Sequence, residues 1–421
     1  MRSNGLKGKV KVGMSRVFWS FLLTAAFTCS VFASAPLPEL VGDGVHDDTD
    51  AIQARLDTKK SCVYLPPPAK CYLISRTLEI HSDQELRLDR YSVIRLAAKS
   101  DCRMLVNRNW KTGDKRVAVT GGIWDFNNLG QSPNPHMTKF CNPPYVAYIP
   151  KQYTRDFFHG EAFTFDRVEG LEIRGVTIRN PTTYGLQLTR VSYFVVDDIT
   201  LDYTTWNPSP LNLDGVHLDG GCHHGRISNI RGTAYDDMVA LNANDWICSA
   251  YEGPIHDIDI DGIYAEYSHS AVRLLSAGAP VSRVNIRNVH GNFYVYAIGL
   301  THHFKEKPRG RFDDIVIENV FISKAKTPEG IGSRAAYPLI WVDTSVDAGS
   351  VTIKGYHRDE STIGIPSICV SEGSHVERLI VRDANMVNRL EKPISFISGK
   401  ERVDTLVTEN IRLIPSDKGW K

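Results

Sequence analysis

Three aspartates and a histidine in the middle of the chain have the side chains that acid–base chemistry needs. Asp236 and Asp237 are adjacent in "AYDDMVAL", Asp214 precedes them in "NLDGVHL", and His269 follows in "YSHSAVRL". A cluster of carboxylates cannot hold all its charges cheaply, so the pKa of at least one carboxyl is expected to rise. One protonated carboxyl beside one ionised carboxylate is the pair that hydrolysis of a glycosidic bond requires.

The elements that position these residues follow from a repeated pattern. From about residue 160 the chain alternates a short β-type run, a polar turn and a second run of the form V-x-I-x-N-V, as in "VSRVNIRNVHGNF". An isolated strand of this length cannot bury both faces, whereas stacked copies bury a continuous core. The sequence therefore predicts an all-β fold, a single-stranded parallel β-helix.

Aligning the first run of each repeat predicts the register of the stack. Two apolar columns are expected to face inward, namely Leu186, Val216, Val239, Val272 and Ile298, and Leu188, Leu218, Leu241, Leu274 and Leu300. Between them lies an outward row of Gln187, His217, Ala240, Arg273 and Gly299. Asp214 and Asp237 each precede an inward valine by two residues, so we expect them on neighbouring rungs about 4.8 Å apart. Asp236 lies beside them, and His269 falls in its column one rung later.

The region before the repeats predicts a cap. "GDGVHDDTDAIQARLD" is a Gly-rich turn that leads into a short helix, with Asp48 or Thr49 as the N-cap. "VYLPPPAKCYLI" reads as a strand, a turn and another strand. We expect residues 36–421 to form one β-helix domain, in which residues 36–80 supply the N-terminal capping helix and the first rungs.

Residues 1–35 read as a signal peptide. A basic stretch precedes an apolar run from Val17 to Phe32, and small residues follow it. We expect a secreted or periplasmic protein; a retained anchor and a start at Met14 are the alternatives. Without this segment the chain has 44 basic and 48 acidic side chains. The acidic balance argues against a nucleic-acid partner, and we expect a monomer with no membrane partner.

The cysteines and histidines do not match a common metal-site pattern. Seven cysteines follow residue 35, so at least one thiol is unpaired within the chain, and Cys62 with Cys71 could close a short loop. His223 and His224 fit no common zinc spacing and read as turn residues. The sequence predicts no cofactor and no metal, with calcium as the alternative given so many carboxylates.

Two groups of motifs resemble a known family. Gly42-Asp43-Gly44, Asp47-Asp48-Thr49 and "VYLPPP" are similar to the N-terminal motif of the pectate-lyase superfamily. The Asn-x-Asp of "NLDG", the Asp pair of "YDDMVAL" and the histidine of "SHSAV" follow the order of the motifs of glycoside hydrolase family 28, the polygalacturonase and rhamnogalacturonase group. The resemblance implies a right-handed parallel β-helix that hydrolyses glycosidic bonds.

The resemblance also implies roles for the matching residues. Asp236 is assigned as the general acid, Asp214 and Asp237 activate water with inversion at the anomeric carbon, and His269 tunes the acid or holds the sugar. Several positions depart from the family. Tyr235, Ser268 and Ser270 replace glycines, and "AIGLTHHF" stands where the family has Arg-Ile-Lys. The loss of that basic pair puts a galacturonan substrate in doubt.

Further residues near the cluster are candidates for substrate binding. They are polar or aromatic and lie on the expected rungs or in the loops beside them: Asn212, His217, Asp219, Arg273, His302, His303, Lys305 and Trp246. Arg273 could replace part of the missing basic pair. Each has a structural alternative, because outward polar residues and polar turns are expected on any rung.

Three classes of function remain open at this stage. The first is a hydrolase acting on a polysaccharide or oligosaccharide, for which a pectin-like or uronate-containing polymer is expected. The second is a polysaccharide lyase or epimerase, which needs a base at C5 of a uronate. The third is a non-catalytic carbohydrate-binding protein of the tailspike type, whose binding would survive loss of the aspartates.

Overall fold

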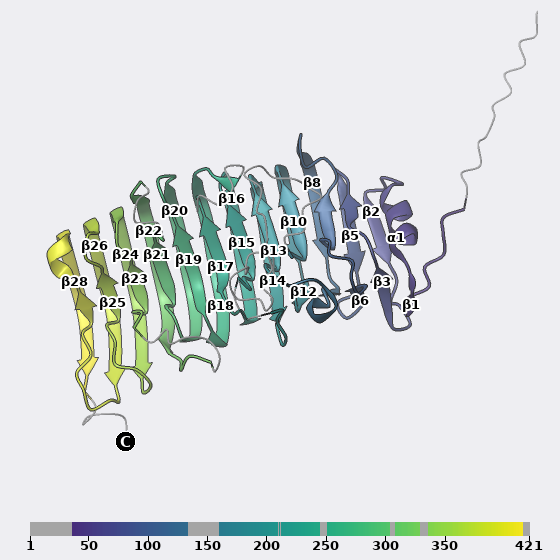
Figure 1. Cartoon of the computed structure of the whole chain (residues 1–421). Coiled ribbons are helices and arrows are strands. Elements are labelled where there is room, and N and C mark those ends of the chain that lie inside the picture. The colour runs from purple at the N-terminus through teal and green to yellow at the C-terminus, as the bar shows by residue number, and fades with distance from the viewer. Residues whose placement is uncertain are drawn as a thin grey trace, which may run out of the picture. The chain divides into compact units, whose positions relative to one another are not determined.

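The computed structural model describes residues 36–133, 160–208, 210, 212–244, 251–303, 308–328 and 336–415. The chain divides into a unit from Met1 to Pro36 and a unit from Leu37 to Lys421, and all the elements below lie in the second. Helices in the described ranges are all too short or too polar to cross a membrane. Figure 1 shows that second unit as a stack of coils with helix α1 at one end and strand β28 at the other.

Two sheets run along the stack, and their strands pair in parallel. The sheet that carries the aspartate cluster consists of β4 (Leu78–Ile80), β7 (Leu105–Asn107), β10 (Phe163–Asp166), β13 (Leu186–Thr189), β15 (Val216–Asp219), β17 (Asp237–Asn242), β19 (Ser270–Leu275), β21 (Ile298–Thr301), β23 (Ile340–Val342), β25 (Ile368–Val370) and β27 (Ile397–Ser398). We call it the short-strand sheet.

The other strands form one long, bent sheet, which we call the long-strand sheet. It consists of β1 (Asp43–Asp47), β2 (Cys62–Leu65), β3 (Cys71–Ile74), β5 (Gln84–Leu88), β6 (Val93–Leu96), β8 (Asp114–Thr120), β9 (Ile123–Asp125), β11 (Val168–Arg174), β12 (Thr177–Arg179), β14 (Ser192–Asp202), β16 (His223–Thr233), β18 (Ile255–Ser268), β20 (Val281–Phe293), β22 (Gly310–Lys324), β24 (Val346–Glu360), β26 (His375–Asn388) and β28 (Val403–Ile414). The predicted parallel β-helix is confirmed.

The predicted register is confirmed residue by residue. Val216 pairs with Leu186 and with Val239, and Val272 pairs with Val239 and Ile298. Both inward columns are fully buried. The outward row is continuous as well: His217 pairs with Ala240, and Ala240 with Arg273. One later rung differs: Ile397 pairs with Ile368, so the last strand begins three residues after the start of the predicted segment "ISFI".

The asparagine of the repeated V-x-I-x-N-V pattern makes the bend inside the long strands. Asn229, Asn288 and Asn319 have φ of 55–56°, in the left-handed region that asparagine and glycine tolerate best. Gly262 and Gly355 occupy the same place in other coils, with φ of 87° and 68°. Each coil therefore turns a corner without breaking its strand pairing.

Helix α1 (Thr49–Leu56) closes the amino-terminal end, as predicted. Ile52 and Leu56 are fully buried against the first rungs. Asp48 is the N-cap residue, but its carboxylate does not cap the helix. It accepts hydrogen bonds from the backbone N–H groups of Val41 (2.7 Å) and Gly42 (3.1 Å) instead, and so ties the Gly-rich turn to the helix.

The loop that Cys62 and Cys71 could close is not crosslinked. Cys62 is exposed on β2, which pairs with β5, whereas Cys71 lies on β3, which pairs with β6. The two thiols therefore belong to different strand ladders. The free cysteines of the described residues also include Cys102, Cys222 and Cys369, and Cys141 and Cys248 lie outside those residues.

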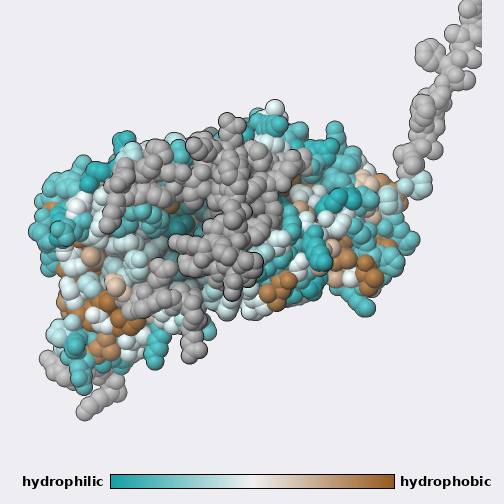
Figure 2. All heavy atoms as spheres, in the orientation of Figure 1, coloured by the Kyte–Doolittle hydropathy of each residue, from teal (hydrophilic) through white to brown (hydrophobic). Residues whose placement is uncertain are grey.

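The outer surface is largely hydrophilic. Figure 2 shows hydrophilic residues over most of the described part of the face in view, with apolar patches toward its two ends. Outward strand positions carry ion pairs between rungs, such as Arg287 with Asp259 (2.7 Å) and Arg179 with Asp202 (2.7 Å). The apolar side chains of the repeated pattern therefore pack in the interior of the coil.

Candidate active site

The predicted aspartates meet at the amino-terminal edge of the short-strand sheet. Asp237 is the first residue of β17 and pairs with Ser270 of β19. Asp214 precedes β15 by two residues, and the N–H of Gly215 donates to the carbonyl of Asp237 (2.9 Å). Tyr296 has the same offset before β21. One column on successive rungs therefore holds Asp214, Asp237, Ser270 and Tyr296.

Asp214 belongs to a buried Asp–His–Asp ion-pair network. Its Oδ2 lies 2.5 Å from Nδ1 of His217, and Nε2 of His217 lies 3.3 Å from Oδ1 of Asp219. The ring stacks on Tyr184, with ring centroids 4.0 Å apart. Burial acts to lower the pKa of His217, but the two carboxylates raise it to about 10. His217 is therefore an imidazolium that holds Asp214 in place, and its predicted contact with substrate is not supported, because it is 1% exposed.

Asp237 is fully buried and is held by three groups. Nε of Arg273 lies 2.8 Å from Oδ2, and Ser270 and Tyr296 donate from their hydroxyls to Oδ1. Nη2 of Arg273 also lies 3.9 Å from Oδ2 of Asp214, so one guanidinium serves both carboxylates. Arg273 is in the predicted row, but these aspartates already engage its charge.

Asp236 is the carboxyl of the three that reaches the surface. Its side chain is 15% exposed, Oδ1 lies 3.6 Å from Nδ1 of His269, and Oδ2 accepts a hydrogen bond from the backbone N–H of Asn212 (3.2 Å). The structure thus brings Asn212 and His269 to the aspartates as predicted, and Asn212 contributes its amide N–H.

The three carboxyls have different proton affinities. Burial raises the pKa of Asp237 well above its usual value, against the opposing effect of Arg273. Burial and then Asp236 raise the pKa of Asp214. Burial acts in the same direction on Asp236, but His269, Arg273 and the Asn212 amide together leave its pKa lowered. Burial therefore favours the protonated form of Asp214 and Asp237, whereas the groups around Asp236 favour its ionised form.

The residues that stand where the family 28 motifs have glycine make specific contacts. Ser270 donates to Asp237, and the hydroxyl of Ser268 donates to the carbonyl of Ala234 (2.8 Å), next to the Asp pair. Tyr235 packs edge-on against Trp206, with ring centroids 5.2 Å apart. These side chains brace the loop that carries the Asp pair.

The two histidines in "THHF" differ in exposure and in contacts. His302 is 4% exposed, and its Nε2 lies 2.9 Å from the carbonyl of Pro308, so it holds the chain rather than the site. The side chain of His303 is exposed and lies close enough to act electrostatically on Asp236. Desolvation by the surrounding residues and then the Arg273 cation lower the pKa of His303. Lys305 and Trp246 lie outside the described residues.

An aromatic cluster beside the aspartates was missed. Tyr294 packs edge-on against His269 (5.3 Å between centroids), and Tyr296 contacts Tyr337 (6.3 Å) and Trp341 (5.6 Å). Trp341 also continues the outward row, because it pairs with Gly299. The signal was in the sequence: Tyr296 precedes Ile298 as Asp237 precedes Val239. Tyr294 and Tyr296 are buried, whereas Tyr337 and Trp341 are partly exposed, so the latter two rings can present a face to a sugar.

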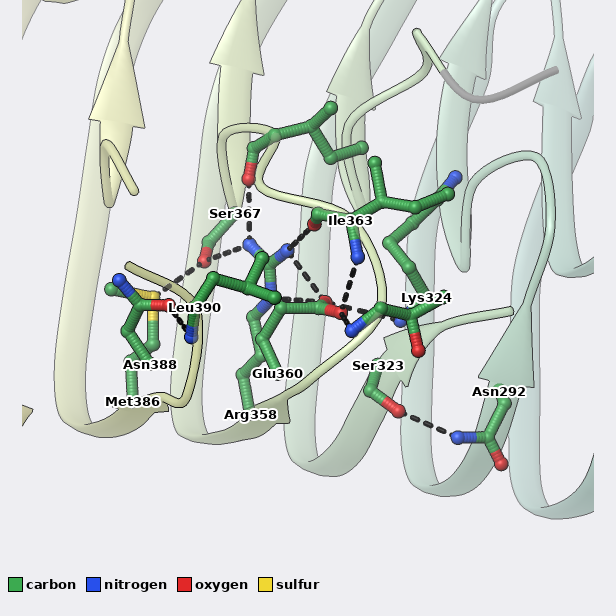
Figure 3. A network of polar contacts seen from close by, with 12 residues as sticks. Asn292, Ser323, Lys324, Arg358, Glu360, Ile363, Ser367, Met386, Asn388 and Leu390 are labelled. Atoms are coloured by element: carbon green, nitrogen blue, oxygen red, sulfur yellow. Dashed lines mark hydrogen bonds and ion pairs between the residues drawn. The ribbon is translucent and has the colours of Figure 1, made fainter. Parts of the chain in front are cut away.

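Figure 3 shows a network of polar contacts that includes Lys324, Arg358 and Glu360, and the ammonium of Lys324 bonds to the segments that carry these aromatic rings. Nζ of Lys324 donates to the carbonyls of Tyr294 (3.2 Å), Val295 and Tyr337 (3.1 Å). The backbone N–H of Lys324 donates to Glu360 (3.3 Å), whose Oε2 also accepts from Arg358 (2.7 Å). Burial lowers the pKa of Lys324 to about 7. The network fixes the two segments that supply the aromatic rings.

Asp236, Asp237 and His269 also form a geometrically possible metal site, because one ligand atom from each lies within 4.8 Å of the others. Arg273 already pairs with Asp237 at 2.8 Å, and Asp237 is fully buried, so a cation would face that guanidinium with no access from solvent at Asp237. The arrangement therefore favours acid–base chemistry by the carboxyls themselves.

Comparison with solved structures places the fold. The chain is similar to an exopolygalacturonase from Thermotoga maritima (TM-score 0.59, 15% identity, 89% of each chain covered). It is also similar to PfbA, a surface adhesin of Streptococcus pneumoniae (0.50, 12%, 89% of each), and to the A-module of the mannuronan C-5 epimerase AlgE6 of Azotobacter vinelandii (0.50, 13%, 89% of this chain and 97% of that one). No protein-family model and no curated protein sequence matches the chain.

These similarities establish a right-handed parallel β-helix of the pectin-lyase type and confirm that part of the family resemblance. The fold is shared by family 28 hydrolases, epimerases and adhesins, and identities of 12–15% do not choose among their functions. A functional assignment must therefore come from the site.

Proposed function

We propose that the protein is a glycoside hydrolase that cleaves a polysaccharide or oligosaccharide with inversion at the anomeric carbon. One observation carries the proposal. Oδ1 of Asp214 is a buried carboxylate oxygen without a hydrogen-bond partner among the described residues, and Oδ2 of Asp237 has the ion pair with Arg273 at 2.8 Å but accepts no hydrogen bond from those residues. Two acceptors on neighbouring rungs, tied to one guanidinium, suit the binding and deprotonation of one attacking water.

Asp236 is the general acid in this proposal. Its exposure lets it reach a leaving oxygen, whereas Asp214 and Asp237 are buried. A sugar bound over Asp236 removes water from the carboxylate, which raises its pKa and lets it take up the proton it must deliver. Arg273 favours the ionised form of the two carboxylates that face the water. His269, next to Asp236, tunes the acid and contacts the sugar.

Proton abstraction at C5 of a uronate is the second candidate, because one observation favours it. The hydroxyl of Tyr296 lies 3.4 Å from Asp237 and its ring lies against His269, so a phenol and an imidazole share the site. Burial raises the pKa of Tyr296 well above its usual value, so the phenol stays protonated at neutral pH. That makes Tyr296 a proton donor and leaves His269 as the base.

A panel of polysaccharides tests the proposal. Pectin-like and other uronate-containing polymers come first, with neutral plant polysaccharides as the comparison, and wild type is assayed beside Asp236→Asn and the matched surface control Asp202→Asn. Hydrolysis predicts new reducing ends without ultraviolet-absorbing product, lost in Asp236→Asn alone. Unsaturated product would support a lyase. Binding without release, equal in all three chains, would support an adhesin. Because of its amino-terminal segment, we propose that the protein acts after export.

A further inference from the structure

A second cluster of ligand-type side chains lies at the start of two long strands, β16 and β18. His223 pairs in register with His256. His224 follows His223, and Asp257 follows His256, so a second pair of ligand-type side chains lies beside the first. Three imidazoles and one carboxylate thus occupy two adjacent positions on two adjacent rungs. We propose that His224, His256 and Asp257 bind a divalent transition-metal ion, with Zn²⁺ as the probe.

The distances suit a single ion. The candidate ligand atoms lie within 4.8 Å of one another. Oδ2 of Asp257 is 2.6 Å from Nδ1 of His256 and 3.8 Å from Nε2 of His224. Ligand atoms on one tetrahedral zinc lie about 3.4 Å apart, given bonds of about 2.0–2.2 Å. Side-chain rotations that move these atoms by less than about 1 Å therefore complete the site. Two nitrogens and one oxygen are a ligand set that zinc accepts.

The rings are oriented in advance. Nδ1 of His223 lies 2.7 Å from Nδ1 of His224, so one of the two must donate its proton to the other. With the proton on Nδ1 of His224, the lone pair of its Nε2 faces Asp257, which is the form that binds metal. Tyr193 stacks on His224 (5.0 Å, 27°), and His223 stacks on His256 (5.0 Å, 10°). His223 therefore acts as the outer partner that sets the tautomer.

Arg283 is the competitor for the carboxylate. Its Nε lies 2.6 Å from Oδ1 of Asp257, and its Nη2 lies 2.9 Å from Oδ2. A bound ion must share Asp257 with this guanidinium, which weakens the site relative to one with an unpaired carboxylate. His224 is exposed, and His256 and Asp257 are half-buried, so an ion can enter from solvent. Once bound, it joins two rungs and stabilises the folded chain.

Calorimetric titration of the full, untagged chain with Zn²⁺ tests the proposal, and thermal unfolding with and without Zn²⁺ gives a second readout. We expect one saturable site per chain and a zinc-dependent rise in Tm. His224→Gln and His256→Gln should each weaken binding at least tenfold, and His223→Gln about tenfold, the loss typical of an outer partner. Arg283→Gln should tighten binding. The matched control is His375→Gln, since His375 is an exposed histidine paired with one carboxylate, Asp404, at 3.0 Å.

The outcomes that overturn the proposal are distinct. Equal zinc binding in wild type, His224→Gln and His256→Gln would show that the cluster holds no ion. Loss of binding in His269→Gln, with His224→Gln unaffected, would place the ion at the aspartate cluster. Tm measured without zinc identifies any variant that fails because it unfolds. None of these readouts needs the hydrolase activity.

Discussion

His217 offers a quantitative test of the buried charge beneath the site. Its pKa of about 10 in the folded protein lies about 3.5 units above the ordinary value of 6.5. At 1.36 kcal/mol per unit, the imidazolium contributes at most about 5 kcal/mol to the free energy of unfolding. The folded state holds this proton after the unfolded state has lost it. The contribution is therefore complete below about pH 6.5 and disappears as the pH rises to about 10.

Lys324 has the opposite effect on the free energy of unfolding over part of the same pH range. Its pKa of about 7 in the folded protein lies below its ordinary 10.5, so its contribution to stability grows as the pH rises through that interval. The pH dependence of the unfolding free energy of wild type therefore combines two opposing contributions, one from His217 and one from Lys324. The contribution of Lys324 cancels in the difference in unfolding free energy between wild type and His217→Gln, because both chains contain Lys324. The assay is urea unfolding of both chains at several pH values from 6.5 to 10. The stability difference should shrink by about 1.4 kcal/mol per pH unit, and a difference independent of pH would refute the buried imidazolium.

Three further predictions concern the site and its scaffold. If Asp214 and Asp237 hold the attacking water, proton NMR of early turnover should show the inverted anomer first, and a first product with the substrate's own configuration would exclude that role. Lys324→Met leaves three carbonyls without the ammonium and should cost about 1–3 kcal/mol in urea unfolding; an unchanged midpoint would show that these hydrogen bonds are dispensable. Gly225→Ala should cost about 1–3 kcal/mol, because a Cβ there would lie 2.0 Å from a phenyl ring of the neighbouring rung, whereas the control Gly364→Ala meets only ordinary contacts of 3.4–3.7 Å.

The stack and the core of the site could be predicted because both depend on local periodicity. A strand period of two places Val216 and Val239 inward, and the same count places Asp214 and Asp237 in one column. The same parity, continued past the end of β21, places His303 rather than His302 on the outward side, since Gly299 lies in the outward row. It would likewise have included Tyr296 in the aspartate column.

Other features depend on contacts that a register cannot supply. Whether Arg273 meets a substrate or a neighbouring aspartate depends on how its long side chain turns, and the structure turns it toward Asp237. Lys324 reaches Tyr337 from a different part of the chain, through a loop whose path has no repeat. The proton distribution among the carboxyls depends on burial, which spacing does not measure. Asp236 therefore matched its family position while its pKa in the free protein runs against the role assigned to it.

The most direct test of the central claim is the rate of reducing-end release by Asp236→Asn on the polymer that wild type cleaves best. The substitution keeps the shape of the side chain and removes one charge from a crowded cluster, so the thermal midpoint should hold. Loss of the proton donor should lower turnover by at least about 10². A correctly folded Asp236→Asn protein that releases reducing ends at the wild-type rate would contradict the account.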